Sequence, residues 1–168
     1  QSQDRYLYSF AVEGKQLPDF TTISRVSRDD DSAIQGYQRP EVLRHINAIK
    51  QYIESDDAMI PNALVIAFDD RVRFEETPGD HQVEYSTPGT LVIPVDPSAP
   101  ETDRPGWIVD GQQRTAAIRD ARVDSFPVSV VAFVAQSDAE QRAQFILVNA
   151  TKPLSKSLIY ELLPATEG

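Results

Sequence analysis

Cysteine is absent from the 168-residue chain, which excludes disulfide bonds, thiolate chemistry and Cys-ligated zinc sites. Histidine is scarce: only His45 and His81 are present, too few for a His-rich metal centre. No stretch approaches the roughly 18–20 apolar residues that a membrane span needs. No basic segment followed by an apolar one opens the chain, so no signal peptide is visible. We therefore expect a cytoplasmic protein with no membrane partner.

The chain has few positively charged residues. It contains 16 Lys and Arg and 26 Asp and Glu, so the net charge is −10. Counterion release drives nonspecific binding to nucleic acid and favours basic proteins. The charge balance therefore disfavours wholesale DNA wrapping, and we expect DNA to be contacted indirectly or weakly. Of the 16 cations, 12 are Arg, the residue that binds phosphate in a bidentate manner, so a local phosphate pocket is still compatible with the composition.

The length and the 40% hydrophobic content predict one folded domain over residues 1–168. Six of the 12 prolines fall between Glu76 and Gly106, which predicts long surface loops around a hairpin, inserted at 76–106. The chain begins at Gln1 rather than Met, and a fragment of a longer protein is one interpretation of that start.

The pattern along the chain alternates strands and helices, which predicts an α/β fold. Continuous apolar or β-branched runs predict strands at 20–27, 63–68, 71–75, 82–85, 90–95, 107–109 and 126–134. A helix is expected from Pro40, where Val42, Ile46, Ile49 and Ile53 form an apolar stripe that Leu43 and Tyr52 widen. Further helices are expected at 115–121, after an N-cap at Asp138, and after an N-cap at Ser155.

The sharpest local feature is the segment WIVDGQQRTAAI at 107–118. A strand ends at Asp110, Gly111 allows a tight turn, and a small-residue helix follows at once. Free backbone N–H groups, the positive end of the helix and Arg114 would meet at one place, and such a place binds phosphate. Asp110 could hold Mg²⁺, and Gln112 and Gln113 could position a water molecule or contact a base edge. A purely structural turn, capped by the same polar residues, is the equal alternative.

Two weaker clusters flank this motif. Gln38 and Arg39 precede the helix at Pro40, where Arg39 could meet a phosphate, although an exposed loop arginine is the commoner interpretation. Asn149 lies where a helix ends before Lys152-Pro153, and on its own it is more typical of a helix end than of a site.

Other candidates favour structural roles. Asp69-Asp70 with Glu75-Glu76 could suggest a metal-dependent nuclease, but solvated turn charges fit better. Trp107 is interpreted as a core residue, with stacking on a base as the alternative, and His45 as a surface or rim residue.

Taken together, the motifs resemble a known family. The chain is similar to the DGQHR-domain proteins and to restriction-enzyme subunits with a DGQQR motif over most of residues 20–163. The segments that carry the resemblance are GYQRPEVLRHINAIKQYIES, IPNALVIAF, VDGQQRTAAI and FILVNATKPLSKSLIYEL. Gln113 stands where the family name has His. The chain is shorter than many of these proteins, and it lacks an HNH-like histidine pair, so DNA cleavage is not carried over.

The resemblance implies a compact ParB/sulfiredoxin-like α/β fold with a mixed sheet and with nucleotide phosphates docked on the DGQQR turn. Carried over by position, the expected catalytic residues are Asp110, Gln112, Gln113 and Arg114. The expected cofactor-binding residues are Gln38, Arg39, Gly111, Arg114, Thr115 and Asn149. The implied cofactors are ATP and Mg²⁺, with the metal on Asp110.

Relatives of this kind occur in bacterial DNA-modification systems. The resemblance is closer to those that insert 7-deazaguanine bases than to those that place phosphorothioate in the DNA backbone. It implies an ATP-hydrolysing component beside a partner such as a base-exchanging transglycosylase. The alternatives are a non-catalytic DNA-binding transcriptional regulator, and a nucleotide-gated assembly switch that forms a homo-oligomer.

Overall fold

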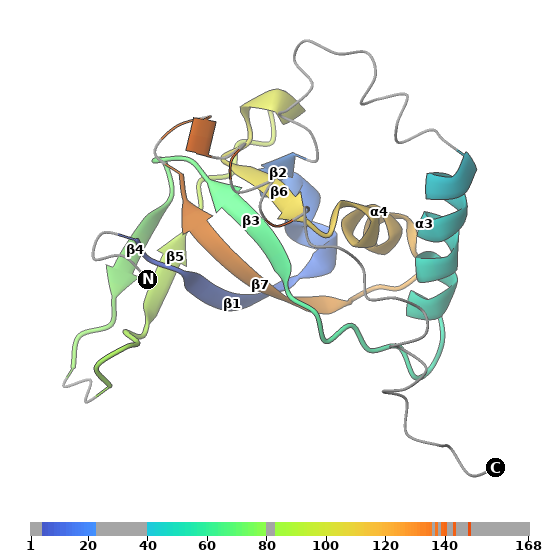
Figure 1. The fold of residues 1–168 in the computed structure, drawn as a ribbon, viewed down its shortest axis with the longest axis horizontal. Coiled ribbons are helices and arrows are strands. Elements are labelled where there is room, and N and C mark those ends of the chain that lie inside the picture. Colours follow the sequence, from blue (N-terminus) through green and yellow to red (C-terminus); the bar gives the residue numbers. More distant parts are fainter. Residues whose placement is uncertain are drawn as a thin grey trace.

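The structure is a computed structural model that describes residues 5–22, 40–79 and 83–135, together with Ser137, Ala139, Glu140, Ala143 and Val148. It has an α/β architecture, as the sequence predicts, with a five-stranded mixed sheet, a second two-stranded sheet and helices on the central sheet (Figure 1). Among the described residues, no helix is long and apolar enough to cross a membrane.

The central sheet has the strand order β1-β7-β3-β6-β2. The strands are β1 (Tyr8–Glu13), β7 (Pro127–Val134), β3 (Leu64–Phe68), β6 (Gly106–Asp110) and β2 (Thr21–Thr22). Along that order the pairings alternate: β1 with β7 is antiparallel, β7 with β3 parallel, β3 with β6 antiparallel, and β6 with β2 parallel. The sheet is therefore mixed, and β6, which carries the DGQQR motif at its end, is an interior strand.

Two helices cover one face of this sheet in succession. The helix α4 (Gln112–Asp120) lies between the sheet and α3 (Pro40–Ile53) (Figure 1). Pro40 is the first helical residue of α3, as predicted. The smaller elements are η1 (Gly14–Gln16), α1 (Leu17–Phe20) and η2 (Glu101–Asp103). The order sheet, α4, α3 leaves the N-terminal end of α4 beside the surface of α3.

The hydrophobic core fills both sides of the central sheet. On the helix side, Ile46 and Ile53 of α3 join Ile118 of α4 in one buried cluster. On the other side, Trp107 is 1% exposed and packs with Ala67 and Val109. The predicted core role of Trp107 is thereby confirmed, and stacking of a base on this ring is excluded because the ring is buried.

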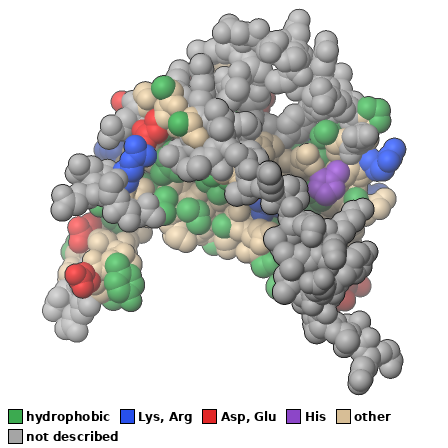
Figure 2. Space-filling view, in the orientation of Figure 1, with side chains coloured by type: hydrophobic (Ala, Val, Ile, Leu, Met, Phe, Trp, Pro, Cys, Tyr) green, Lys and Arg blue, Asp and Glu red, His purple; other side chains and the backbone are tan. Residues whose placement is uncertain are grey.

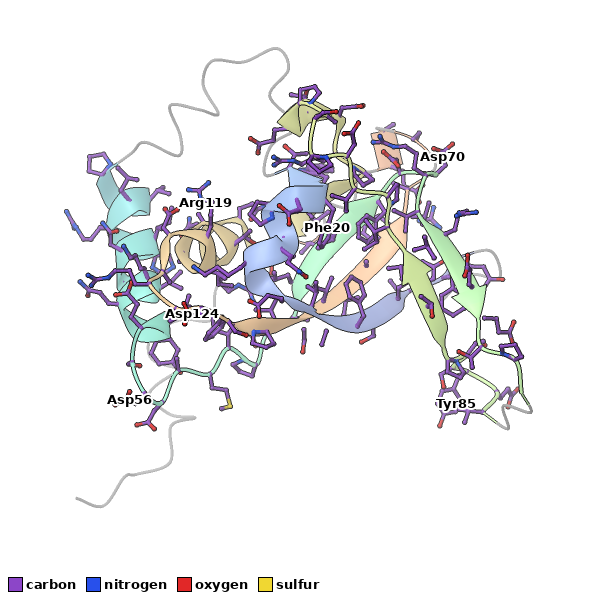
Figure 3. All side chains as sticks on the ribbon, turned by 180° about the vertical axis from the view of Figure 1, so that it is seen from behind. Phe20, Asp56, Asp70, Tyr85, Arg119 and Asp124 are labelled. Atoms are coloured by element: carbon purple, nitrogen blue, oxygen red, sulfur yellow. The ribbon has the colours of Figure 1, made fainter. Side chains whose placement is uncertain are left out.

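The second sheet is a hairpin of β4 (Arg73–Glu76) and β5 (Gly89–Val92), which projects from the body of the protein (Figure 1). The strands expected at 71–75 and 90–95 are confirmed with shifted ends. The strand expected at 82–85 is wrong for 83–85, because β4 pairs with 89–92 and leaves that segment in the connection, while Gln82 lies outside the described residues. Tyr85, 92% exposed, lies at the far end of this hairpin (Figure 3).

Several boundaries differ from the sequence predictions. Phe20 belongs to α1 rather than to a strand, Thr21–Thr22 of the expected 20–27 strand form β2, and 23–27 lie outside the described residues. The backbone N–H of Glu140 donates to Oγ of Ser137 at 3.2 Å, so Ser137 caps this helical segment, whereas the predicted cap Asp138 lies outside the described residues. The helix expected after Ser155 also lies outside them.

Candidate functional site

The DGQQR segment forms the strand–turn–helix that its sequence predicts. Strand β6 ends at Asp110, Gly111 has φ 98° and ψ 19°, and α4 begins at Gln112. This left-handed conformation is one that side chains disfavour. A Cβ atom at Gly111 would also overlap Cδ2 of Leu64 and lie 3.2 Å from Nη2 of Arg114. Glycine is therefore required for both the backbone angle and the space.

The first turn of α4 leaves backbone donors outside the helical hydrogen-bond ladder. The ladder starts where the N–H of Thr115 donates to the carbonyl of Gly111 at 2.8 Å. The N–H groups of residues 112–114 precede it, and this end of a helix carries a partial positive charge. No acidic residue lies within the first turn, although Asp110 immediately precedes the N-cap residue Gly111. The turn therefore offers donors and positive potential to an anion.

Arg114 points back across the turn and holds it together. Its Nη2 lies 2.9 Å from a carboxylate oxygen of Asp110, its Nη1 donates to the carbonyl of Asn62 at 2.6 Å, and a longer contact of 3.5 Å reaches the carbonyl of Ala63. The Arg114 side chain is 19% exposed and the Asp110 side chain 42%. The guanidinium thus ties the segment before β3 to the end of β6, a role that sequence reasoning did not anticipate.

The two glutamines of the motif differ in their surroundings. The Nε2 of Gln112 donates to the carbonyls of Val109 at 2.9 Å and Ile108 at 3.2 Å, so this amide caps the end of β6. The side chain of Gln113 has no hydrogen-bond partner among the described residues. Gln113 is therefore the glutamine whose amide is available to a ligand or a water molecule.

A cleft of about 430 Å³ opens beside this turn, within the size range of small-molecule sites. The motif residues at 110–114 form one wall, and residues of α3 and the segment after it form the other. The residues of this second wall are His45, Ile49, Tyr52 and Ile60. The DGQQR turn therefore lines a hollow that has both polar and apolar sides.

The cleft brings together five of the predicted site residues. These are Asp110, Gly111, Gln112, Gln113 and Arg114. Thr115 is only 2% exposed and does not line the cleft, and its hydroxyl has no hydrogen-bond partner among the described residues. The predicted residues Gln38, Arg39 and Asn149 lie outside the described residues.

The wall formed by α3 was not predicted as part of a site. His45, Ile49 and Tyr52 follow the spacing i, i+4, i+7, which places them on one face of α3. That face adjoins the buried stripe of Ile46 and Ile53 and turns toward the cleft. The prediction that His45 is a surface or rim residue is consistent with its exposed position at the cleft.

A magnesium ion has a limited set of ligands here. Among the described residues, no group of three His, Asp or Glu side chains could hold a metal ion. Asp110 offers a single carboxylate, and one of its oxygens is already paired with Arg114. Mg²⁺ is usually bound by one or two carboxylates together with substrate phosphates and water. The site therefore suits a magnesium–phosphate complex better than a free magnesium ion.

The acidic pairs near the hairpin form no comparable site. The carboxylate of Asp69 accepts hydrogen bonds from the Arg71 side chain at 2.8 Å and 3.1 Å, which lowers its availability to a metal. Glu75 and Glu76 lie on β4 with exposed side chains. This arrangement agrees with the prediction of solvated turn and hairpin charges.

The fold and the cleft define a small α/β protein with a glycine-dependent strand–turn–helix at a ligand-sized hollow. The family DndB, described as DNA-sulfur modification-associated, matches residues 1–161. The chain belongs to this family and is thereby a component of a DNA phosphorothioation system. No curated protein and no solved structure matches the chain significantly. The predicted role in DNA modification is confirmed, whereas the preference for 7-deazaguanine insertion is not, and the ParB/sulfiredoxin-like assignment stays a prediction.

Proposed function

We propose that the DGQQR cleft binds the phosphates of a nucleoside triphosphate and that the protein hydrolyses this nucleotide for DNA sulfur modification. The observation that carries the proposal is the position of the α4 N-terminus, with its three backbone donors, at the wall of a cleft of about 430 Å³. Helix N-termini bind phosphate because their N–H groups and dipole both favour an anion.

The remaining polar residues of the cleft fit the same ligand. His45 supplies a hydrogen-bonding imidazole from the opposite wall, and Gln113 supplies an amide that no described residue engages. Asp110 would hold Mg²⁺ through its exposed carboxylate together with phosphate oxygens. Arg114 acts by fixing the turn, because its guanidinium is occupied by Asp110 and by two backbone carbonyls.

The hydrolytic step is the attack of water on the γ-phosphorus. A new P–O bond forms to the water oxygen, the bond to the β–γ bridging oxygen breaks, and the diphosphate leaves with that electron pair. The water proton passes to phosphate or solvent. Such a reaction depends mainly on positioning and electrostatics. In this protein, Gln113 would orient the water, and the α4 N-terminus would stabilise negative charge on the phosphoryl oxygens.

The charge distribution supports a nucleotide rather than duplex DNA as the direct ligand. The net charge is −10, and the described Lys and Arg side chains on the face in Figure 2 lie apart rather than in one patch. We therefore assign DNA contact to partner enzymes of the modification system and retain weak or indirect DNA binding for this chain. A base-exchanging partner has no support from the sulfur-modification family.

The test is phosphate release from ATP, GTP and CTP with Mg²⁺, measured for the parent, Gln113→Ala and Asp110→Asn. Gln113→Ala is the sharper variant, because it removes an amide without a described partner and should leave the melting temperature unchanged. The proposal predicts about a hundredfold loss of turnover for Gln113→Ala, at the lower end of the roughly 10²–10⁴-fold contribution of a positioned catalytic group. Full turnover in both variants would place hydrolysis elsewhere.

A nucleotide-gated switch is the second candidate, and one observation favours it. The two walls of the cleft belong to α3 and α4, which pack against each other, so a bound nucleotide would bridge two helices. A ligand that prefers one arrangement of these helices would shift their equilibrium without turnover. Tight nucleotide binding with no phosphate release would select this candidate over the hydrolase.

A further inference from the structure

The wall of the cleft opposite the DGQQR turn is largely apolar. Ile49 and Tyr52 of α3 line it together with Ile60. Tyr52 is 45% exposed, which is high for a large ring, and it is one of the residues that line the cleft. Phosphate alone would need no such surface, so the cleft suits an anion that also carries an apolar group.

The ring of Tyr52 is held in place from its polar end. Its hydroxyl accepts a hydrogen bond from the Met59 backbone N–H at 2.9 Å and donates to the Met59 carbonyl at 3.0 Å. A tyrosine hydroxyl has one donor, and here that donor is used within the protein. What remains for a ligand is the ring itself, already fixed in orientation, so that binding loses little side-chain entropy.

The end of α3 reinforces this position. The Ser55 hydroxyl donates to the Tyr52 carbonyl at 2.6 Å, and the Ser55 backbone N–H donates to the same carbonyl at 3.0 Å. The carbonyl of Tyr52 and the hydroxyl at the tip of its ring are therefore both held by hydrogen bonds. This fixed aromatic surface faces the same hollow as the anion-favouring end of α4.

We propose that Tyr52, supported by Ile49 and Ile60, is the platform on which the base of the bound nucleotide stacks. The inference rests on the proposed nucleotide function and adds to it the residue that recognises the base. Aromatic side chains stack on any base because every base has a π-face, and one stacking contact typically contributes about tenfold or more to affinity. Trp107 cannot take this role, because its ring is buried in the core.

The experiment measures binding of Mg-ATP and of inorganic tripolyphosphate by titration calorimetry. The proteins are the parent, Tyr52→Leu, Tyr52→Phe and the control Tyr85→Leu. Tyr52→Leu keeps an apolar side chain but removes the ring, and Tyr52→Phe keeps the ring but removes the hydroxyl. Tyr85 is 92% exposed and lies on the hairpin, away from α3 (Figure 3), so it controls for loss of a surface tyrosine.

The platform predicts that Tyr52→Leu weakens Mg-ATP binding about tenfold and leaves tripolyphosphate binding unchanged. Tyr52→Phe should retain most of the affinity for Mg-ATP, and Tyr85→Leu should bind both ligands as the parent does. Equal binding of Mg-ATP by Tyr52→Leu and the parent would overturn the inference and leave the phosphate site standing. An equal loss of both ligands would also overturn it, because Tyr52 would then act through the fold. Failure of the parent to bind either ligand would refute the proposed function itself.

Discussion

Replacement of Arg114 by alanine should destabilise the protein, whatever its effect on catalysis. The change removes the ion pair with Asp110 and the hydrogen bond to the Asn62 carbonyl, at 2.9 Å and 2.6 Å. A hydrogen bond from a charged group typically contributes about 1.5–3 kcal/mol. The ion pair adds about 0–1 kcal/mol, because the Asp110 side chain is 42% exposed and solvent screens it. We therefore expect a loss of about 2–3 kcal/mol.

Thermal and urea unfolding would measure this loss. For a domain of this size, 1 kcal/mol lowers the melting temperature by roughly 2–4 °C, so Arg114→Ala should melt about 4–12 °C below the parent. Arg114→Lys should fall between the two, because an ammonium group cannot reproduce the two-sided contact of a guanidinium. The matched control is Arg44→Ala on the exposed side of α3, which removes the same charge and should stay within about 0.5 kcal/mol of the parent.

Equal melting temperatures for Arg114→Ala and Arg44→Ala would refute the structural role assigned to Arg114. In that case the guanidinium would be free to face a ligand, as the sequence alone predicted. If the expected difference is found, any loss of nucleotide turnover in Arg114→Ala must be compared at a temperature where both proteins are folded.

Two further predictions concern the turn and the end of β1. Gly111→Ala should lower the free energy of unfolding by about 2–5 kcal/mol. Of this, roughly 1–2 kcal/mol comes from the left-handed backbone and roughly 1–3 kcal/mol from displacement of Leu64. A loss below about 1 kcal/mol would show that the turn can relax. The pKa of Glu13 is lowered from its ordinary value of about 4.5, chiefly by the Phe126 backbone N–H and then by the Ser125 hydroxyl. Its contribution to stability is complete above that value and is lost as the pH falls through the lower, folded-state pKa. The stability gap between the parent and Glu13→Gln should therefore shrink as the pH falls from about 5 through the lowered, folded-state pKa, and a gap that does not change with pH would contradict this assignment.

The elements that the sequence predicted correctly are those with a local signal. The apolar run that ends at Phe68 is a buried strand, and the apolar stripe after Pro40 lies on α3. Both could be predicted because apolar runs and helix periodicity depend on residues close together in the sequence. The strand β1 was missed, although Tyr8, Phe10 and Val12 alternate with more exposed positions and carry a period-two signal. Its pairing with β7, more than 100 residues away in the chain, has no local signature.

The sequence predicted one wall of the candidate site, the turn at 110–114, but not the opposite wall. The turn at 110–114 was predicted because a strand, a glycine and a small-residue helix follow one another directly. The opposite wall depends on how α3 packs against α4, and Tyr52 was interpreted there as part of an apolar stripe. The hydrogen bond from Arg114 to the Asn62 carbonyl could not be predicted either, because it depends on where the segment before β3 lies in the folded protein.

The central claim is that nucleotide phosphates dock on the N-terminal end of α4, and backbone NMR on the 18.7-kDa chain tests it most directly. Titration with Mg-ATP should shift the amide signals of Gln112, Gln113 and Arg114 most strongly, with smaller changes along the α3 wall. Tripolyphosphate should shift the same three amides. Saturating ligand that leaves these amides unmoved, or shifts that gather on the β4–β5 hairpin instead, would contradict the account.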